Sequence, residues 1–296
     1  MRLQRAITGV VVLLVASAGA GAQRRGVETS SLAATVDSRA LQPGELVVFT
    51  MRVDGEPSSV DVELFGRHAA AFLLDDGRWR ALVGIDLDQK PASYVATIEA
   101  RLPSGTLRVT RTIVVKPKIF PTRTLTVSPD FVNPPESERL RIERDSAFLR
   151  GIFAASPPRR LWTRAFVPPV PDPANSRFGT RSIFNGERRN PHGGADFASP
   201  LGRPVKAPAG GRIVGARELF FTGNVVIIDH GLGMFSLLAH LSRIDVKEGD
   251  EVQGGEVVGL VGATGRVTGA HLHWALTISG ARIDPVSALA LLGKPD

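Results

Sequence analysis

Short runs of alternating apolar and polar residues fill the chain between about residues 31 and 118, as expected for half-buried β-strands. Examples are LVVFTMRV, SVDVELF and SYVATIEARL, and turn-forming groups such as QPGE, DDGR and LPSG separate them. Several short strands at this spacing predict a small β-sandwich of immunoglobulin-like type. We therefore assign residues 23–118 to an immunoglobulin-like β-sandwich domain.

A proline-rich segment over residues 119–165 interrupts the strand pattern. Within it, NPPESERLRIERDSAFLRGIF predicts one helix, because Asn133 can cap the N-terminus and Glu136 stands three residues later. Leu140 and Phe148 belong to an apolar stripe along this helix. We expect the helix to pack as a strut between two domains.

Strand patterns return from about residue 166 to the end, in GNVVIIDHG, MFSLLAHL, EVVGLVG and HLHWALTI. Glycine-rich turns join them, which predicts a second, mainly antiparallel β domain over residues 166–296. SALALL near the C-terminus predicts one helical turn. The expected fold is therefore mainly β: an N-terminal sandwich, a short helical linker and a C-terminal antiparallel β domain.

Residues 1–22 have the pattern of a secretory signal peptide, with Arg2 and Arg5 ahead of an apolar run and small residues up to Ala22. The apolar run is shorter than the roughly 20 residues that cross a bilayer as a helix. We therefore predict cleavage before Gln23 and export to the periplasm, the cell envelope or the outside, without stable membrane insertion. An uncleaved membrane anchor is the alternative.

The composition narrows the classes of function. The chain of 296 residues has no cysteine, so disulfides and thiolate zinc clusters are both excluded and the domains must hold by packing. Its net charge of +7 is spread over many arginines, and a single tyrosine offers no stacking platform for nucleic acid. We expect no nucleic-acid partner, whereas a polyanionic envelope surface is compatible with the charge.

Histidines gather in the C-terminal segment, which holds five of the six. His68 stands apart, and we expect a surface or packing role for it. His271 and His273 in HLHW are two residues apart, so both point to the same face if this segment is a strand.

A metal site is the chemical interpretation of this cluster. His192 and Asp196 in PHGGAD offer a further nitrogen and a carboxylate oxygen, both of kinds that zinc accepts. Three protein ligands with a fourth position left to water would make a catalytic zinc centre. We expect Gly193 and Gly194 to let the chain turn sharply so that His192 and Asp196 reach one metal. The alternative is a set of separate surface histidines.

Three motifs stand in this order: RFGTRSIFNGERRNPHGGADFASP, LLAHLS and GAHLHWAL. Over about the last 120 residues the chain closely resembles the lysostaphin- and LytM-type zinc metallo-endopeptidases, which are peptidoglycan hydrolases. The resemblance implies a Zn²⁺ cofactor held by His192, Asp196 and His273. It also implies that His240 and His271 are unligated catalytic histidines that serve the attacking water and the tetrahedral intermediate.

The implied activity is cleavage of peptide bonds in the stem or cross-link peptides of bacterial peptidoglycan. Asn185 resembles a position that lines the family's groove, which implies a substrate contact. Leu238 departs from the family, which usually has a tyrosine two residues before the AHL histidine, so one substrate contact is missing or supplied elsewhere. His230 also matches the family, and we expect it to hydrogen-bond within its own turn.

Two other functions deserve comparison with this one. A non-catalytic cell-wall-binding protein of the same fold would activate other wall hydrolases, but all five site residues are present here. VKEGDEVQGGEVVGLVGATG resembles the hairpin of a biotinyl or lipoyl carrier, yet the following GATGRVTGAH has no lysine to carry the cofactor. The proline-rich linker would also allow the N-terminal domain to lie over the metal groove and limit access.

Overall fold

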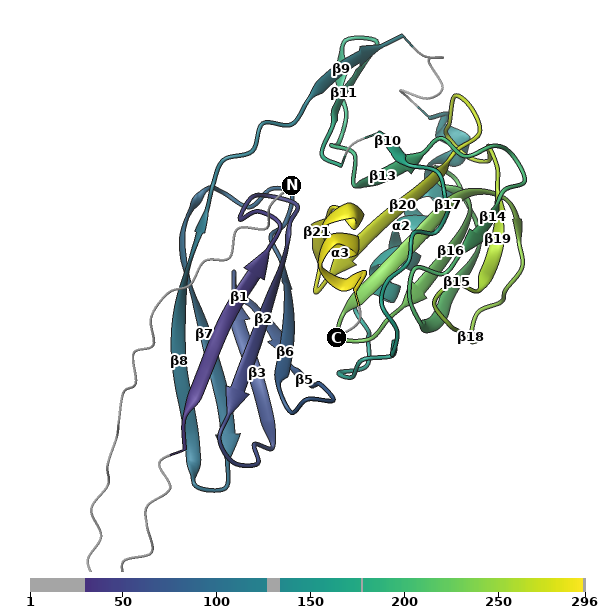
Figure 1. Ribbon diagram of the computed structural model, residues 1–296. Coiled ribbons are helices and arrows are strands. Elements are labelled where there is room, and N and C mark those ends of the chain that lie inside the picture. The colour runs from purple at the N-terminus through teal and green to yellow at the C-terminus, as the bar shows by residue number, and fades with distance from the viewer. Residues whose placement is uncertain (1–29, 127–133, 177, 295–296) are drawn as a thin grey trace, which may run out of the picture.

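The computed structural model describes residues 30–126, 134–176 and 178–294 of the chain. Strands dominate these ranges and two α-helices accompany them, so the prediction of a mainly β fold is confirmed (Figure 1). The predicted signal segment, residues 1–22, lies outside the described residues. None of the helices within the described ranges has the length and apolar character needed to cross a bilayer.

Two antiparallel four-stranded sheets form the N-terminal part. The first contains, in spatial order, β1 (Leu32–Ser38), β2 (Leu46–Val53), β6 (Trp79–Gly84) and β5 (Phe72–Leu73). The second contains β4 (Arg67–Ala70), β3 (Ser59–Leu64), β7 (Ala92–Leu102) and β8 (Gly105–Val115). Alternate residues of both sheets, among them Phe49, Val62 and Ile98, meet in one apolar core. His68 on β4 is largely exposed and lies 3.1 Å from Asp61, so its predicted surface role is confirmed.

Part of the segment after the sandwich pairs with a strand of the C-terminal part. β9 (Thr122–Leu125) pairs in parallel with β11 (Arg181–Phe184), and β12 (Glu187–Arg188) completes a small three-stranded sheet. Because parallel pairing joins two distant parts of the sequence, this segment becomes a structural element beside the C-terminal domain (Figure 1).

The predicted linker helix is present as a 3₁₀ turn, η1 (Glu136–Glu138), followed by α2 (Arg139–Phe153). Its α-helical part begins at Arg139, and the proposed cap, Asn133, lies outside the described residues. Leu140, which we placed in the apolar stripe, is 62% exposed.

We expected α2 to pack as a strut between the two domains. It instead covers one face of the C-terminal sheet. Phe148, Leu149, Ile152 and Phe153 pack on a cluster formed by Leu219, Val225, Ile227, Leu237 and Ala239. The Arg217 guanidinium lies 3.9 Å from the centre of the Phe148 ring, and Asp145 accepts a hydrogen bond from the backbone N–H of Phe220 (2.7 Å). The helix is thus an outer layer of the C-terminal domain.

A ten-stranded antiparallel sheet forms the C-terminal part, as the strand pattern predicts. Its main path is β10 (Ala174–Ser176), β13 (Gly194–Phe197), β20 (Leu272–Ile278), β17 (Met234–Ile244), β16 (Gly223–Asp229), β15 (Gly211–Leu219) and β18 (Glu251–Val252). The remaining strands are β14 (Pro204–Lys206), β19 (Val257–Val261) and β21 (Ala281–Ile283). α3 (Pro285–Leu292) follows, capped by Asp284, whose carboxylate accepts from the Val286 N–H. The predicted C-terminal turn is therefore a full short helix.

The sandwich and the C-terminal domain share a third apolar core. Leu46, Val48 and Leu82 of the sandwich belong to one buried cluster with Met234, Leu276, Ile278, Ala281, Ile283, Ala288 and Leu292. Gly84 at the end of β6 lies so close to this cluster that a Cβ atom there would come within 2.8 Å of Ile278 and Ala281. Burial of apolar side chains from both sides fixes the sandwich against β21 and α3.

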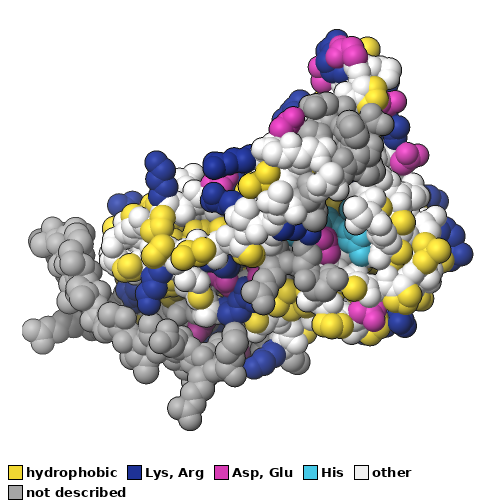
Figure 2. Space-filling model, turned by 90° about the horizontal axis from the view of Figure 1, so that it is seen from above, with side chains coloured by type: hydrophobic (Ala, Val, Ile, Leu, Met, Phe, Trp, Pro, Cys, Tyr) yellow, Lys and Arg dark blue, Asp and Glu magenta, His cyan; other side chains and the backbone are white. Residues whose placement is uncertain are grey.

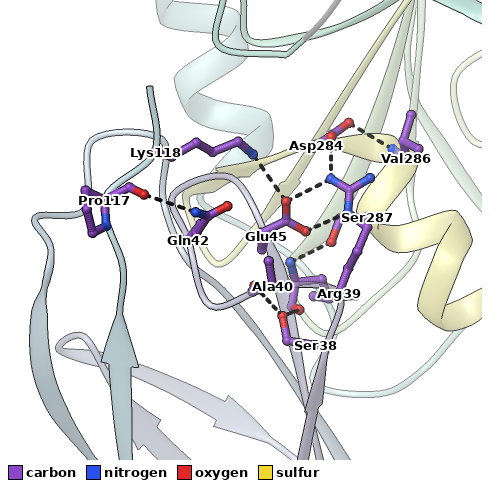
Figure 3. A network of polar contacts seen from close by, with 11 residues as sticks. Ser38, Arg39, Ala40, Gln42, Glu45, Pro117, Lys118, Asp284, Val286 and Ser287 are labelled. Atoms are coloured by element: carbon purple, nitrogen blue, oxygen red, sulfur yellow. Dashed lines mark hydrogen bonds and ion pairs between the residues drawn. The ribbon is translucent and has the colours of Figure 1, made fainter. Parts of the chain in front are cut away.

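A network of charged and polar side chains also joins the two domains at this interface (Figure 3). Arg39 donates two hydrogen bonds to Glu45, at 2.9 and 2.8 Å, and one to Asp284 at 2.7 Å. Lys118 adds a bond of 3.2 Å to Glu45, and the Ser287 hydroxyl accepts from the Leu46 N–H. Burial raises the pKa of Glu45, but the hydrogen bonds and charge of Arg39 outweigh it and hold the pKa below its usual value.

Candidate metal centre

Two neighbouring strands carry the central residues of the candidate site. β13 and β20 pair so that Asp196 lies directly opposite His273. On β20 the alternate residues Leu272 and Trp274 are buried in the core, and His271 and His273 therefore face the other side. The spacing in HLHW places both imidazoles in one site, as the sequence predicts.

His192 completes the group from the loop before β13. Its backbone is held by hydrogen bonds to Gly179 and Thr180 (2.8 and 2.9 Å). Its Nε2 lies 3.0 Å from Asp196 Oδ1 and 3.0 Å from His273 Nδ1, and these last two atoms are 2.8 Å apart. Three potential ligand atoms, all at partly buried side chains, thus converge on one point.

The glycines between His192 and Asp196 act differently from our expectation. Neither Gly193 nor Gly194 has a positive φ, so the chain does not need glycine there to make a sharp turn. A Cβ atom at Gly194 would instead come within 2.9 Å of His273 Nε2 and would clash with the Trp274 carbonyl oxygen. Gly194 therefore permits close packing of the His273 ring on β13.

The pKa shifts of Asp196 and His273 favour the forms that bind a cation. Burial raises the pKa of Asp196, but the hydrogen bonds and charges of His192 and His273 outweigh it, so the net pKa is well below its usual value. Burial lowers the pKa of His273. A carboxylate and neutral imidazoles are the forms that bind metals, and two ring nitrogens 3.0 Å apart beside one carboxylate oxygen leave room for one shared cation. The donor set therefore fits a metal ion.

His240 and His271 lie beside these ligands. His240 Nδ1–H donates to the Thr264 carbonyl and His271 Nδ1–H donates to the Gly269 carbonyl, each at 2.9 Å. With Nδ1–H engaged in this way, Nε2 is the nitrogen that carries the lone pair in the neutral form of either ring. The two ring centres are 4.8 Å apart, and His271 Nε2 is 3.8 Å from Asp196 Oδ1.

Burial lowers the pKa of His240 to about 4, with a smaller contribution from the charge of His273. His240 is therefore neutral at pH 7.

His230 hydrogen-bonds within its turn through its backbone, whose N–H donates to the Met234 carbonyl (2.8 Å), whereas its side chain bonds to groups outside the turn. The side chain is fully buried, Nδ1–H donates to the Gly210 carbonyl (2.8 Å), and Nε2 accepts from the Ser236 hydroxyl (2.8 Å). The Ser236 oxygen in turn accepts from Trp274 Nε1–H at 3.0 Å. Through Ser236, His230 is thus linked to Trp274 on β20, the residue that follows His273 in sequence.

A cavity of about 550 Å³ opens over the five site residues. Figure 2 shows histidine side chains inside a hollow of this face. Further lining residues, which sequence reasoning missed, are Arg123, Ser182, Phe184, Arg189, Phe221, Thr222 and Arg266. No described sandwich residue lines the cavity, so in this structure the N-terminal domain does not lie over the groove.

Asn185 lies at the exposed tip of the β11–β12 hairpin with φ 51°, outside the residues that line the cavity. Leu238 is fully buried in the core of the sheet. The structure thus brings five predicted residues together, whereas Asn185 is not among the residues that line the cavity. GERRN and TGRV, which flank the metal motifs, contain Arg189 and Arg266, whereas nothing local in the sequence marks Arg123.

Residues 190–285 match the model of peptidase family M23. Over 123 residues the chain is 39% identical to the peptidoglycan DD-endopeptidase ShyA of Vibrio cholerae, a match that covers 39% of this chain and 29% of that protein. Over 96 residues it is 48% identical to the DD-carboxypeptidase/endopeptidase Mpg of Neisseria meningitidis, covering 32% of this chain and 22% of that protein. The chain thus spans less than a third of the length of these relatives.

A crystal structure of a peptidase M23 from Pseudomonas aeruginosa resembles the chain over a longer stretch. The two superpose with a TM-score of 0.63 and 33% identity, over 83% of this chain and 93% of that one. The similarity therefore extends well beyond the segment that the family model matches.

Proposed function

Because the chain belongs to peptidase family M23, we propose that it is a zinc-dependent endopeptidase that cleaves stem or cross-link peptides of bacterial peptidoglycan. The observation that carries this proposal is the convergence of His192 Nε2, Asp196 Oδ1 and His273 Nδ1 within one cleft. Peptidoglycan as substrate is supported by the names of the two curated relatives.

His192, Asp196 and His273 would hold the ion. Two imidazole nitrogens and one carboxylate oxygen are ligands that zinc accepts, and three protein ligands leave a position for water. An ion held there would supply an activated water and a polarised scissile carbonyl. The cleft side chains then have to orient the peptide and move protons.

His271 is the group we assign to the proton of the attacking water. Its Nδ1–H is held by the Gly269 carbonyl, so Nε2, 3.8 Å from Asp196 Oδ1, is the atom that accepts the proton. His240, fixed by Thr264 and neutral at pH 7, supplies a second imidazole beside it. The pair can pass a proton toward the leaving amine as the peptide bond breaks.

Two further assignments complete the proposal. Asn185 would contact only a substrate that extends beyond the cavity, because it lies at the exposed tip of its hairpin. The export signal in residues 1–22 would deliver the enzyme to the periplasm or cell envelope, where its substrate lies.

The test uses the chain from Gln23 onward, purified and analysed for metal, then incubated with isolated peptidoglycan. We expect about one zinc per chain, and mass spectrometry of the released fragments to reveal new peptide termini that identify the cleaved bond. Removal of the metal with a chelator should stop release, and added zinc should restore it. Bound zinc without any cleavage, together with stimulation of a separate wall hydrolase, would instead support the non-catalytic alternative.

A further inference from the structure

Three arginines line the cleft above the candidate metal ligands: Arg123, Arg189 and Arg266. Asp196 is the only acidic residue among the described residues that line it. The walls therefore carry three positive charges against one negative charge, and a metal cation adds to this excess. An excess of positive charge in a concave site attracts anionic groups of a ligand.

Arg189 presents a donor that the protein leaves unused. One terminal nitrogen pairs with Glu187 at 2.8 Å, and the backbone N–H donates to the Ser182 carbonyl. Its Nε is buried and has no hydrogen-bond partner within the described part of the chain. A buried donor without a partner is costly, so a ligand oxygen that reached it would gain a strong hydrogen bond.

Arg266 lines the same cavity from the loop between β19 and β20. Its guanidinium lies 4.5 Å from the centre of the Phe221 ring, and its backbone N–H donates to the Phe221 carbonyl (2.9 Å). Burial, and then the positive charge of Arg189, lowers the pKa of Arg266. Both arginines line the same cavity, so an anion bound there would be attracted by two like charges.

We propose that Arg189 and Arg266 form a subsite that binds a free carboxylate of the peptide substrate near the scissile bond. Guanidinium groups match a carboxylate with paired N–H donors, which favours it over a neutral amide. Arg123 on β9, held by the Ser182 hydroxyl at 3.0 Å, adds positive charge to the wall. The proposal rests on the proposed peptidase function and specifies its substrates as acidic peptides.

The carboxylate has two sources in a peptide, its C-terminus and an acidic side chain. Three synthetic peptides of one sequence separate them: both carboxylates free, only the C-terminus amidated, or only the side chain amidated. For the zinc-loaded protein we expect kcat/KM to fall about 10- to 100-fold for one of the two amides, the size of a charge-assisted hydrogen bond. The carboxylate that is blocked in the peptide with the lower kcat/KM is the group that the subsite recognises.

Variants locate the effect at the arginines. Arg266→Gln and Arg189→Gln should each cleave the acid and the affected amide at similar rates, and Arg266→Lys should keep part of the preference because it keeps the charge. Arg243→Gln is the matched control, because Arg243 is 63% exposed at its side chain and pairs with Asp245 outside the cleft. It should retain the full preference.

Binding provides a readout that does not need cleavage. Calorimetry with the His271→Ala variant should give a lower Kd for the acid peptide than for the affected amide, and Arg266→Gln in that background should remove the difference. Equal Kd values in the first case, or a full acid preference after loss of Arg266, would overturn the subsite. Acid-selective binding with no cleavage by the wild type would overturn the peptidase function and leave the subsite standing.

Discussion

The domain interface and the candidate metal cleft both bury carboxylates among nitrogen-bearing side chains, but the carboxylates find different partners in the two places. At the interface, Glu45 and Asp284 each receive hydrogen bonds from Arg39, and Lys118 adds a second cation (Figure 3). In the cleft, one oxygen of Asp196 faces two imidazoles that also face each other.

The difference separates a structural network from a ligand site. Every charge at the interface has an opposite charge within the network, so nothing further has to bind. The cleft atoms converge instead on a shared point, and a cation there satisfies all of them together. Convergence of donor atoms, rather than burial or charge alone, is therefore the feature that indicates a metal.

The largest expected effect in this comparison comes from His273→Ala. The change removes one of three proposed protein ligands, and an incomplete ligand set holds zinc poorly. We expect loss of both bound zinc and detectable cleavage. Metal analysis beside a cleavage assay measures this, with circular dichroism to verify folding, and a variant that keeps zinc and activity would remove His273 from the ligand set.

His271→Ala should separate proton transfer from metal binding. Because His271 is assigned to the proton and not to the ion, most zinc should remain while the rate falls about 10²–10⁴-fold. The same two assays apply. If this variant lost zinc and His273→Ala kept it, the two assignments would have to be exchanged.

Arg39→Ala tests the charge network at the domain interface, which joins Arg39, Glu45, Asp284 and Lys118. Glu45 and Asp284 would lose a shared cation at a nearly buried site, and removal of one partner from such a network typically costs about 3 kcal/mol of unfolding free energy. Urea unfolding measures this. Arg243→Ala, which breaks an exposed pair with Asp245, serves as the control and should cost no more than about 1 kcal/mol.

Zinc content should stay unchanged in Arg39→Ala, because the network holds no donor in the cleft. Zinc loss in a folded Arg39→Ala protein would show that the interface and the cleft are not independent.

The smallest effect concerns the buried hydrogen-bonded group of His230, Ser236 and Trp274. Burial lowers the pKa of His230 to about 4, so between pH 4 and 6.5 the unfolded chain binds a proton that the folded chain does not. The contribution of neutral His230 to the free energy of unfolding is therefore fully present above pH 6.5 and declines as the pH falls. From pH 7 to 5 we expect a loss of about 2 kcal/mol from His230, and an NMR titration of its ring that gave an ordinary pKa would contradict this.

Short-range patterns predicted much of this molecule. Period-two alternation located the strands on both sides of residues 119–165, and the two-residue spacing of His271 and His273 placed both rings on one face. The linker helix followed from its composition, but the side on which it packs did not. The side on which it packs depends on an apolar face of β15–β17. This face exists only once the sheet has formed, so no local pattern in the helix indicates it.

The sequence by itself thus determined the strands, the helix, the five histidine and aspartate positions and the family motifs, because each is encoded by residues within a few positions of one another. Only the tertiary structure decided which distant groups meet. Arg123 reaches Ser182 across 59 residues through the β9–β11 pairing, and Gly194 is required by the His273 ring. Such contacts depend on chain path and packing volume, for which a local sequence pattern carries no signal.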